Sequence, residues 1–286
     1  MCELYFINIG IYIIALASNA FVKEKLSAYF FEMKVTSIFF DLDGTVYSGC
    51  SAIAGAVEFI DRLAVSHSES RFLTNRSDRS SEEVANHLNS LGITCNSDLV
   101  ITSAMAAAEM VKGRRVAVVG SENLYKVVED AGGFVTRDNP DNLLVGFDPK
   151  IDFNDIGHMC SLLEEGVRFL ATNGDKWIKI NSRLYPENGM VLAAIESLTK
   201  IKPIIVGKPN ISIIDRALES IDNTDGSIIL IGDNLETDTM AAQNAGLSSI
   251  LILTGVTNEE TADASDIKPT WRVRNYEELS QLVFSG

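Results

Sequence analysis

Segments rich in apolar, β-forming residues alternate with segments of helical periodicity from residue 34 to the end of the chain. This alternation is typical of a parallel sheet whose strands are joined by crossover helices. We therefore expect an α/β protein. Its length of 286 residues allows one large domain or two medium ones.

The predicted elements form an outer set and a middle set. The outer set includes a helix over residues 80–91 that begins with a capping box of Ser80 and Glu83 and ends at Gly92. Outer strands are predicted at 37–40, 71–73, 204–206, 228–231, 249–253 and 271–273, and middle strands at 116–119, 143–147 and 167–171. Other helices are predicted at 54–65, 123–131 and 155–165, and from residues 211, 237 and 276. The middle set is large enough to be a domain of its own.

Acidic residues outnumber basic ones, with 39 Asp and Glu against 24 Lys and Arg and a formal net charge of -15. A chain of this charge repels a phosphate backbone, so we do not expect it to bind nucleic acid. A small anionic substrate would need local help from a divalent cation, a lysine or helix N-termini.

The four cysteines are widely spaced, and none belongs to a Cys-x-x-Cys pair. This spacing fits the reduced thiols of a cytoplasmic protein better than a disulfide framework or a zinc site. The cysteines are Cys2, Cys50, Cys95 and Cys160.

The N-terminal stretch differs from the rest of the chain. Residues 4–22 are almost wholly apolar and are followed by Lys23 and Lys25, which would suit a marginal membrane anchor with the folded part on the cytoplasmic side. A secretory signal is disfavoured because no basic residue precedes the apolar stretch. We favour a simpler interpretation, in which translation starts at Met33 and residues 1–33 are an extension from a mis-assigned start.

The segment Asp41-Leu42-Asp43-Gly44-Thr45 follows the apolar run at 37–40. Such a run suits a strand buried on both faces of a parallel sheet, and Gly44 permits a sharp exit from it. Open parallel sheets bind ligands at the carboxyl ends of their strands. Two carboxylates there can divide the work, one attacking or holding a cation and the other transferring a proton. The alternative is a solvated Asp-Gly turn.

Three further polar clusters each follow another outer strand. Thr74 and Asn75 offer a hydroxyl and an amide to an oxyanion, although turn capping is the alternative for these residue types. Lys208 places an ammonium where it can neutralise a phosphate. Asp233 and Asp238 offer carboxylate oxygens of the kind that Mg²⁺ prefers. Four clusters at strand ends indicate an active site more strongly than any one of them.

The order and spacing of these clusters resemble the four motifs of haloacid dehalogenase (HAD) superfamily phosphatases. The matching segments are DLDGT at 41–45, LTN at 73–75, GKP at 207–209 and GDNLETD at 232–238. The long insert before the third motif, with TNGD at 172–175, resembles the NagD-type branch. The resemblance implies a Rossmann-like, doubly wound parallel sheet core at 34–107 and 201–286, with an inserted α/β cap domain at 108–200.

By motif position, the resemblance implies a Mg²⁺-dependent phosphatase that works through an aspartyl-phosphate. Asp41 would be the nucleophile, and Asp43 the acid and base. The phosphate ligands would be Thr74, Asn75, Lys208 and Gly44. Mg²⁺ would bind Asp41, the backbone carbonyl of Asp43 and Asp233, and the residues supporting these ligands would be Asp238 and Asn234. An acid at position 43 resembles the phosphatases of the superfamily, not its ion pumps or dehalogenases.

The insert is expected to close over the sheet edge as a cap and to read the leaving group. Its candidate specificity residues are Asn173 and Asp175, although a plain turn would also explain this polar cluster. Arg76, where relatives commonly have a second asparagine, would add positive charge near the substrate or point into solvent. The rings of Trp177 and Tyr185 are predicted to pack inside the insert.

Our leading hypothesis is a phosphatase that acts on a small phosphorylated metabolite. Candidate substrates are phosphoglycolate, glycerol phosphate, a sugar phosphate, a nucleotide monophosphate and pyridoxal phosphate. The alternative is a non-catalytic protein that binds a phosphorylated ligand on the same scaffold, but such a protein would not need Asp43, Asp233 and Lys208 together. The sequence leaves open a homodimer formed through the insert, and it predicts membrane contact only if residues 4–22 are a real anchor.

Overall fold

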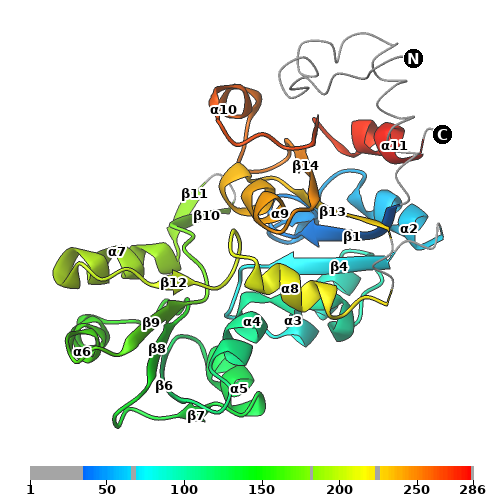
Figure 1. Cartoon of the computed structure of the whole chain (residues 1–286). Coiled ribbons are helices and arrows are strands. Elements are labelled where there is room, and N and C mark those ends of the chain that lie inside the picture. Colours follow the sequence, from blue (N-terminus) through cyan, green and yellow to red (C-terminus); the bar gives the residue numbers. More distant parts are fainter. Residues whose placement is uncertain (1–34, 66–68, 181–182, 223–225, 285–286) are drawn as a thin grey trace, which may run out of the picture.

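Two parallel sheets organise the chain (Figure 1). The structure is a computed structural model that describes residues 35–65, 69–180, 183–222 and 226–284. The first sheet has six strands in the order β15-β14-β13-β1-β4-β5, and the second has five in the order β12-β9-β8-β6-β7. The second sheet is formed by the green and yellow part of the chain, which is inserted between the two parts that form the first sheet.

Every strand pair within the two large sheets is parallel. The first sheet consists of β1 (Val35–Asp41), β4 (Glu69–Thr74), β5 (Val100–Thr102), β13 (Ser227–Gly232), β14 (Ser248–Ile252) and β15 (Trp271–Val273). The second consists of β6 (Arg115–Val119), β7 (Phe134–Val135), β8 (Asn142–Val145), β9 (Arg168–Ala171) and β12 (Ile204–Ile205). Two antiparallel hairpins pair β2 (Tyr47–Ser48) with β3 (Ser51–Ala52), and β10 (Trp177–Ile180) with β11 (Arg183–Pro186).

Helices connect the strands of both sheets. They are α2 (Ala56–Val65), α3 (Ser81–Ser90), α4 (Ser103–Met110), α5 (Glu122–Asp130), α6 (Phe153–Glu164), α7 (Asn188–Thr199), α8 (Ser212–Leu218), α9 (Met240–Asn244), α10 (Glu259–Ala264) and α11 (Tyr276–Phe284), with a π-helical turn at Leu235–Thr239. The predicted capping box is confirmed, because Ser80 and Glu83 satisfy each other's backbone at the start of α3. No helix within the described residues is long and apolar enough to cross a membrane. The apolar stretch at 4–22 lies outside them.

The central strand β1 is buried on both faces, as its apolar run predicts. Ile38 and Phe40 pack into a core on one side of the first sheet, whereas Phe39 packs into a core on the other side. Each fully buried side chain of this kind stabilises the fold by about 1.5–3 kcal/mol. The strand that leads to Asp41 is therefore held firmly between two apolar layers.

One apolar core joins the two sheets. It contains the alanine-rich helix α4, together with Leu73 and Ile101 from the first sheet and Val116 and Val118 from the second. The outer face of the second sheet has a separate core with α6 and α7. The contact between the sheets is thus a packed apolar layer.

The structure corrects two predictions. We expected the strand near residue 204 to lie in the first sheet, but Ile204–Ile205 pairs with β9 in the second. The hydrogen bonds continue beyond it, because the N–H group of Val206 donates to the carbonyl of Ala171 at the end of β9, and that of Gly207 donates to the carbonyl of Thr172. The rings of Trp177 and Tyr185 were expected to pack, but they are 42% and 44% exposed, because their hairpin pairs only with itself.

Candidate active site

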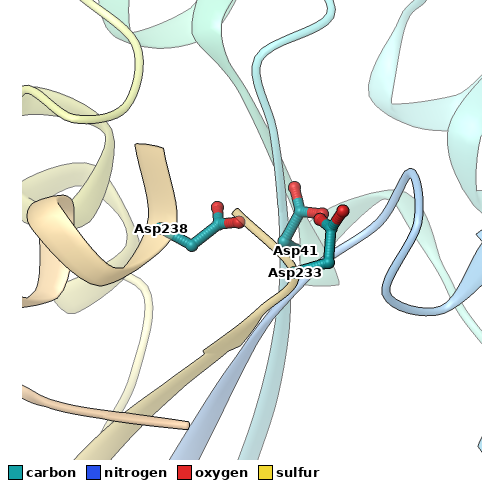
Figure 2. Close-up of side chains that lie close together, drawn as sticks. All are labelled: Asp41, Asp233 and Asp238. Atoms are coloured by element: carbon teal, nitrogen blue, oxygen red, sulfur yellow. The ribbon is translucent and has the colours of Figure 1, made fainter. Parts of the chain in front are cut away.

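A buried cluster of charges lies at the carboxyl ends of β1 and β13. Asp41 ends β1 and Asp233 follows β13, while Asp238 lies in the π-helical turn beyond it. Carboxylate oxygens of these three residues lie within 4.8 Å of one another (Figure 2). The ammonium of Lys208 lies 2.5 Å from Asp41 Oδ1 and 2.7 Å from Asp238 Oδ1. The Thr45 hydroxyl adds a hydrogen bond of 3.1 Å to Asp41 Oδ2.

Lys208 balances part of this negative charge. Burial alone would lower its pKa, but the neighbouring carboxylates of Asp238 and Asp41 outweigh burial and raise the pKa, so the ammonium stays charged. Burial, followed by repulsion from Asp41, raises the pKa of Asp238 to about 7. Burial, followed by repulsion from Asp41 and Asp238, raises the pKa of Asp233 well above its usual value. The cluster therefore holds more negative charge than one lysine compensates.

Two glycines leave the space that the Asp233 carboxylate occupies. A Cβ atom on Gly255 would lie 1.9 Å from Asp233 Oδ2, and one on Gly44 would lie 2.6 Å from it. Gly44 also has a φ of 91°, which side-chain-bearing residues rarely adopt. The N–H group of Val256 donates to Asp233 Oδ2 at 2.5 Å. Sequence reasoning missed Gly255 and Val256, although a glycine two residues beyond the predicted strand at 249–253 is the signal that marks them.

Asp43 is placed apart from the three clustered carboxylates. The Tyr47 hydroxyl donates a hydrogen bond of 3.4 Å to Asp43 Oδ2. Burial raises the pKa of Asp43 to about 6, against an opposing effect of the positive charges of Arg76 and Arg79. A carboxyl group with this pKa can carry a proton near neutral pH. Sequence reasoning did not single out Tyr47.

Three of the predicted phosphate ligands already have hydrogen-bond partners within the protein. Thr74 is buried at the end of β4, and its hydroxyl oxygen accepts the Arg76 N–H at 3.1 Å, as in a capped turn. Both N–H bonds of the Asn75 amide are directed to protein acceptors on Lys208 and Asp175, and its contact with phosphate stays a prediction. The backbone N–H of Gly44 donates to the Tyr47 carbonyl, so it does not face an open site.

The remaining candidates have protein partners of their own. Arg76 forms two hydrogen bonds with Asp78, at 3.0 and 2.8 Å, so it does not point freely into solvent. Asn173 is buried and donates to Asp175 Oδ2 at 2.9 Å. The backbone N–H of Asn234 donates to Asp238 Oδ2 at 3.1 Å, and its side chain caps the π-helical turn.

The donor set suits a hard divalent cation. Asp41, Asp233 and Asp238 supply oxygen atoms, which is what Mg²⁺ prefers, and all three are buried. Burial first, and then repulsion between the carboxylates, raises the pKa values of Asp233 and Asp238, and a cation would offset that repulsion. The residues present therefore fit a Mg²⁺ ion.

Family models and individual related proteins both match this chain. Residues 38–133 match the family described as haloacid dehalogenase-like hydrolase, and residues 205–279 match a second HAD-hydrolase-like family. The 5'-nucleotidase YutF of Bacillus subtilis is 34% identical over 234 residues, which cover 80% of this chain and 91% of that protein. The chain belongs to the HAD-like hydrolases.

Solved structures of this family share the fold. NagD from Escherichia coli K-12 aligns with a TM-score of 0.79 and 30% identity, covering 85% of this chain and 98% of that one. Glycerol phosphate phosphatase of Mycobacterium tuberculosis, solved in complex with magnesium, aligns with a TM-score of 0.78 and 32% identity, covering 86% and 76%. The predicted NagD-type, Rossmann-like α/β fold is confirmed. Within the HAD family, the chain is a phosphomonoester hydrolase.

Proposed function

We propose that this chain hydrolyses small phosphomonoesters in a Mg²⁺-dependent reaction that passes through an aspartyl-phosphate on Asp41. The proposal rests mainly on the different environments of two aspartates that are two residues apart. Asp41 is held by Lys208 and Thr45 at the sheet edge, which suits a fixed nucleophile. Asp43 lies outside that cluster, and its pKa of about 6 suits a proton carrier.

The proposed reaction has two displacements. Asp41 attacks phosphorus while Asp43 gives its proton to the departing alkoxide oxygen. Asp43 then takes a proton from the water that attacks the aspartyl-phosphate, and inorganic phosphate leaves. Lys208 neutralises charge on the phosphoryl oxygens, which a carboxylate could not approach unaided. Asp238 already accepts hydrogen bonds from the Lys208 ammonium and the Asn234 N–H, so it would support the ion without binding it directly. Asp41, Asp233 and the Asp43 carbonyl would hold Mg²⁺, which would supply further positive charge to the phosphoryl group.

The substrate class is a small phosphorylated metabolite. The related proteins carry names for nucleotide and glycerol phosphate hydrolysis, and leaving groups of both kinds are small, polar alcohols. The positive charge of Arg76 acts on Asp43, so it lies near the position where the leaving oxygen would receive its proton. We therefore place phosphoglycolate, glycerol phosphate, sugar phosphates, nucleotide monophosphates and pyridoxal phosphate on the test panel.

The test is phosphate release from this panel, with and without Mg²⁺, by the parent protein and the Asp41→Asn variant. We expect Mg²⁺-dependent release by the parent and a loss of about 10⁴-fold or more in the variant, because the nucleophile is removed. Asp61→Asn is the matched control, since Asp61 is exposed on α2. Release by the variant at the parental rate would refute the mechanism. A folded parent that binds Mg²⁺ and phosphate esters but releases no phosphate would support the non-catalytic alternative.

A further inference from the structure

Asp175 connects the second sheet to the active-site edge of the first. It lies in the loop after β9, outside the cluster of catalytic carboxylates. Its Oδ2 atom accepts hydrogen bonds from Asn173 in the same loop, at 2.9 Å, and from Asn75 after β4, at 3.0 Å. One carboxylate oxygen thus joins two segments that are 100 positions apart in the sequence.

Asn75 links Asp175 to the backbone of Lys208. Its Oδ1 atom accepts the backbone N–H of Lys208 at 2.8 Å, and its Nδ2 atom donates to the Lys208 carbonyl at 3.0 Å. The amide therefore pairs with both backbone groups of the residue whose ammonium contacts Asp41. The fit is close, because a Cβ atom on Gly207 would lie 2.5 Å from Asn75 Oδ1.

The carboxylate of Asp175 reinforces the orientation of the Asn75 amide that pairs with the Lys208 backbone. A primary amide has two N–H donors on one side and an acceptor oxygen on the other, whereas an ionised carboxylate only accepts. If the amide were turned over, its oxygen would face the Asp175 carboxylate, and its NH₂ group would face the N–H of Lys208. Both contacts would be repulsive, so Asp175 stabilises the orientation that holds Lys208.

We propose that Asp175 is a positioning residue that fixes the backbone of Lys208 through Asn75. This inference rests on the proposed phosphatase function for its kinetic consequence, and it differs from the expectation that Asp175 reads the leaving group. Lys208 acts on the phosphoryl group that all substrates share. Loss of Asp175 should therefore affect every substrate equally, and it should also weaken the binding of inorganic phosphate, which has no leaving group.

The experiment compares Asp175→Ala with the control Lys176→Ala, since Lys176 is the exposed next residue of the same loop. We expect Asp175→Ala to lower kcat/KM by about 10- to 100-fold for 4-nitrophenyl phosphate, glycerol phosphate and a nucleotide monophosphate alike, as displaced catalytic groups do. Inhibition by inorganic phosphate should weaken, and hydrogen exchange at the Lys208 backbone amide should accelerate. The control should match the parent in each measurement.

Other results would overturn the proposal. A loss confined to one substrate would mean that Asp175 reads the leaving group, and unchanged Lys208 exchange would mean that it does not hold that backbone. If Asp175→Ala does not fold, Asp175→Asn keeps the side-chain volume and should show a smaller, equally uniform loss. If the parent releases no phosphate, the proposed function fails, but phosphate binding and Lys208 exchange still test the role of Asp175.

Discussion

The two parallel sheets present edges of opposite character at their carboxyl ends. The edge of the first sheet carries ionisable residues, with Asp41 after β1 and Asp233 after β13. The edge of the second sheet carries Gly146 after β8 and Thr172 after β9, which lie against Ser77 of the first-sheet segment. Both edges have the topology that favours a ligand site. Side-chain chemistry, and not topology, therefore decides which edge reacts and which supports it.

The exception to this contrast is the lysine of the charged edge. Lys208 follows β12, a strand of the second sheet, but its ammonium lies among the carboxylates of the first. The second sheet thus supplies the cation that contacts Asp41 and Asp238 of the first.

Of the variants that compare the two edges, Lys208→Met should have the largest effect. The substitution removes the ammonium and leaves Asp41 and Asp238 buried without their cationic partner. We expect kcat/KM to fall by about 10³-fold, as when a charge-stabilising donor is lost, and the thermal midpoint to fall as well. Steady-state kinetics and a melting curve measure both. Lys176→Met, at an exposed lysine of the second-sheet edge, should change neither. Equal losses in the two variants would remove the contrast between the edges.

Replacing a glycine by alanine should impair activity at the first-sheet edge but not at the second-sheet edge. In Gly255→Ala the new Cβ atom would meet Asp233 Oδ2 at 1.9 Å, so the carboxylate must move. In Gly174→Ala the nearest neighbour of the new Cβ atom, Ile205 Cδ1, would lie at an ordinary contact distance of 3.5 Å. We expect Gly255→Ala to lower kcat/KM by about 10²-fold, which is typical of a displaced catalytic group, and Gly174→Ala to have little effect. Parental activity in Gly255→Ala would show that the Asp233 position tolerates displacement.

The pH dependence should report the proton on Asp43. Burial raises the pKa of Asp43 to about 6, and the first step needs its protonated form. We therefore expect kcat/KM to fall by about tenfold per pH unit above pH 6, because the protonated fraction falls at that rate. Arg76 lowers this pKa, so Arg76→Met should move the fall to higher pH. Arg114→Met, at an exposed arginine, should leave the profile in place. A shift to lower pH in Arg76→Met would contradict the assignment.

Mg²⁺ should stabilise the charged edge against heat. A ligand present at 100 times its Kd stabilises the native state by about 2.7 kcal/mol, which corresponds to a rise in Tm of about 4–5 °C for a chain of this size. We expect this rise in the parent and its absence in Asp233→Asn, as measured by differential scanning calorimetry. Asp61→Asn should behave like the parent, since Asp61 is exposed. An undiminished rise in Asp233→Asn would place the cation elsewhere.

Local signals in the sequence predict the elements at the active-site edge of the first sheet, but they do not predict the pairing and contacts at the edge of the second sheet. The apolar run of β1, the carboxylates after it and the capping box of α3 each depend on neighbouring residues, and the structure has them as predicted. The partner of β12 depends on two isoleucines that either sheet could accept. The alanines of α4 are buried in several directions, so its sequence has no one-sided apolar pattern from which the helix could be predicted. The partners of Asn75 and Asp175 are set by tertiary contacts across 100 positions.

The separation of the site along the chain has one more consequence. The segment at 38–133 carries Asp41 and Asp43, whereas the segment at 205–279 carries Lys208 and Asp233. A cut within the intervening insert would leave a nucleophile without its cation in one half and a cation without its nucleophile in the other. Hydrolysis would then return only when the two halves reassemble, so this enzyme has the layout of a split reporter.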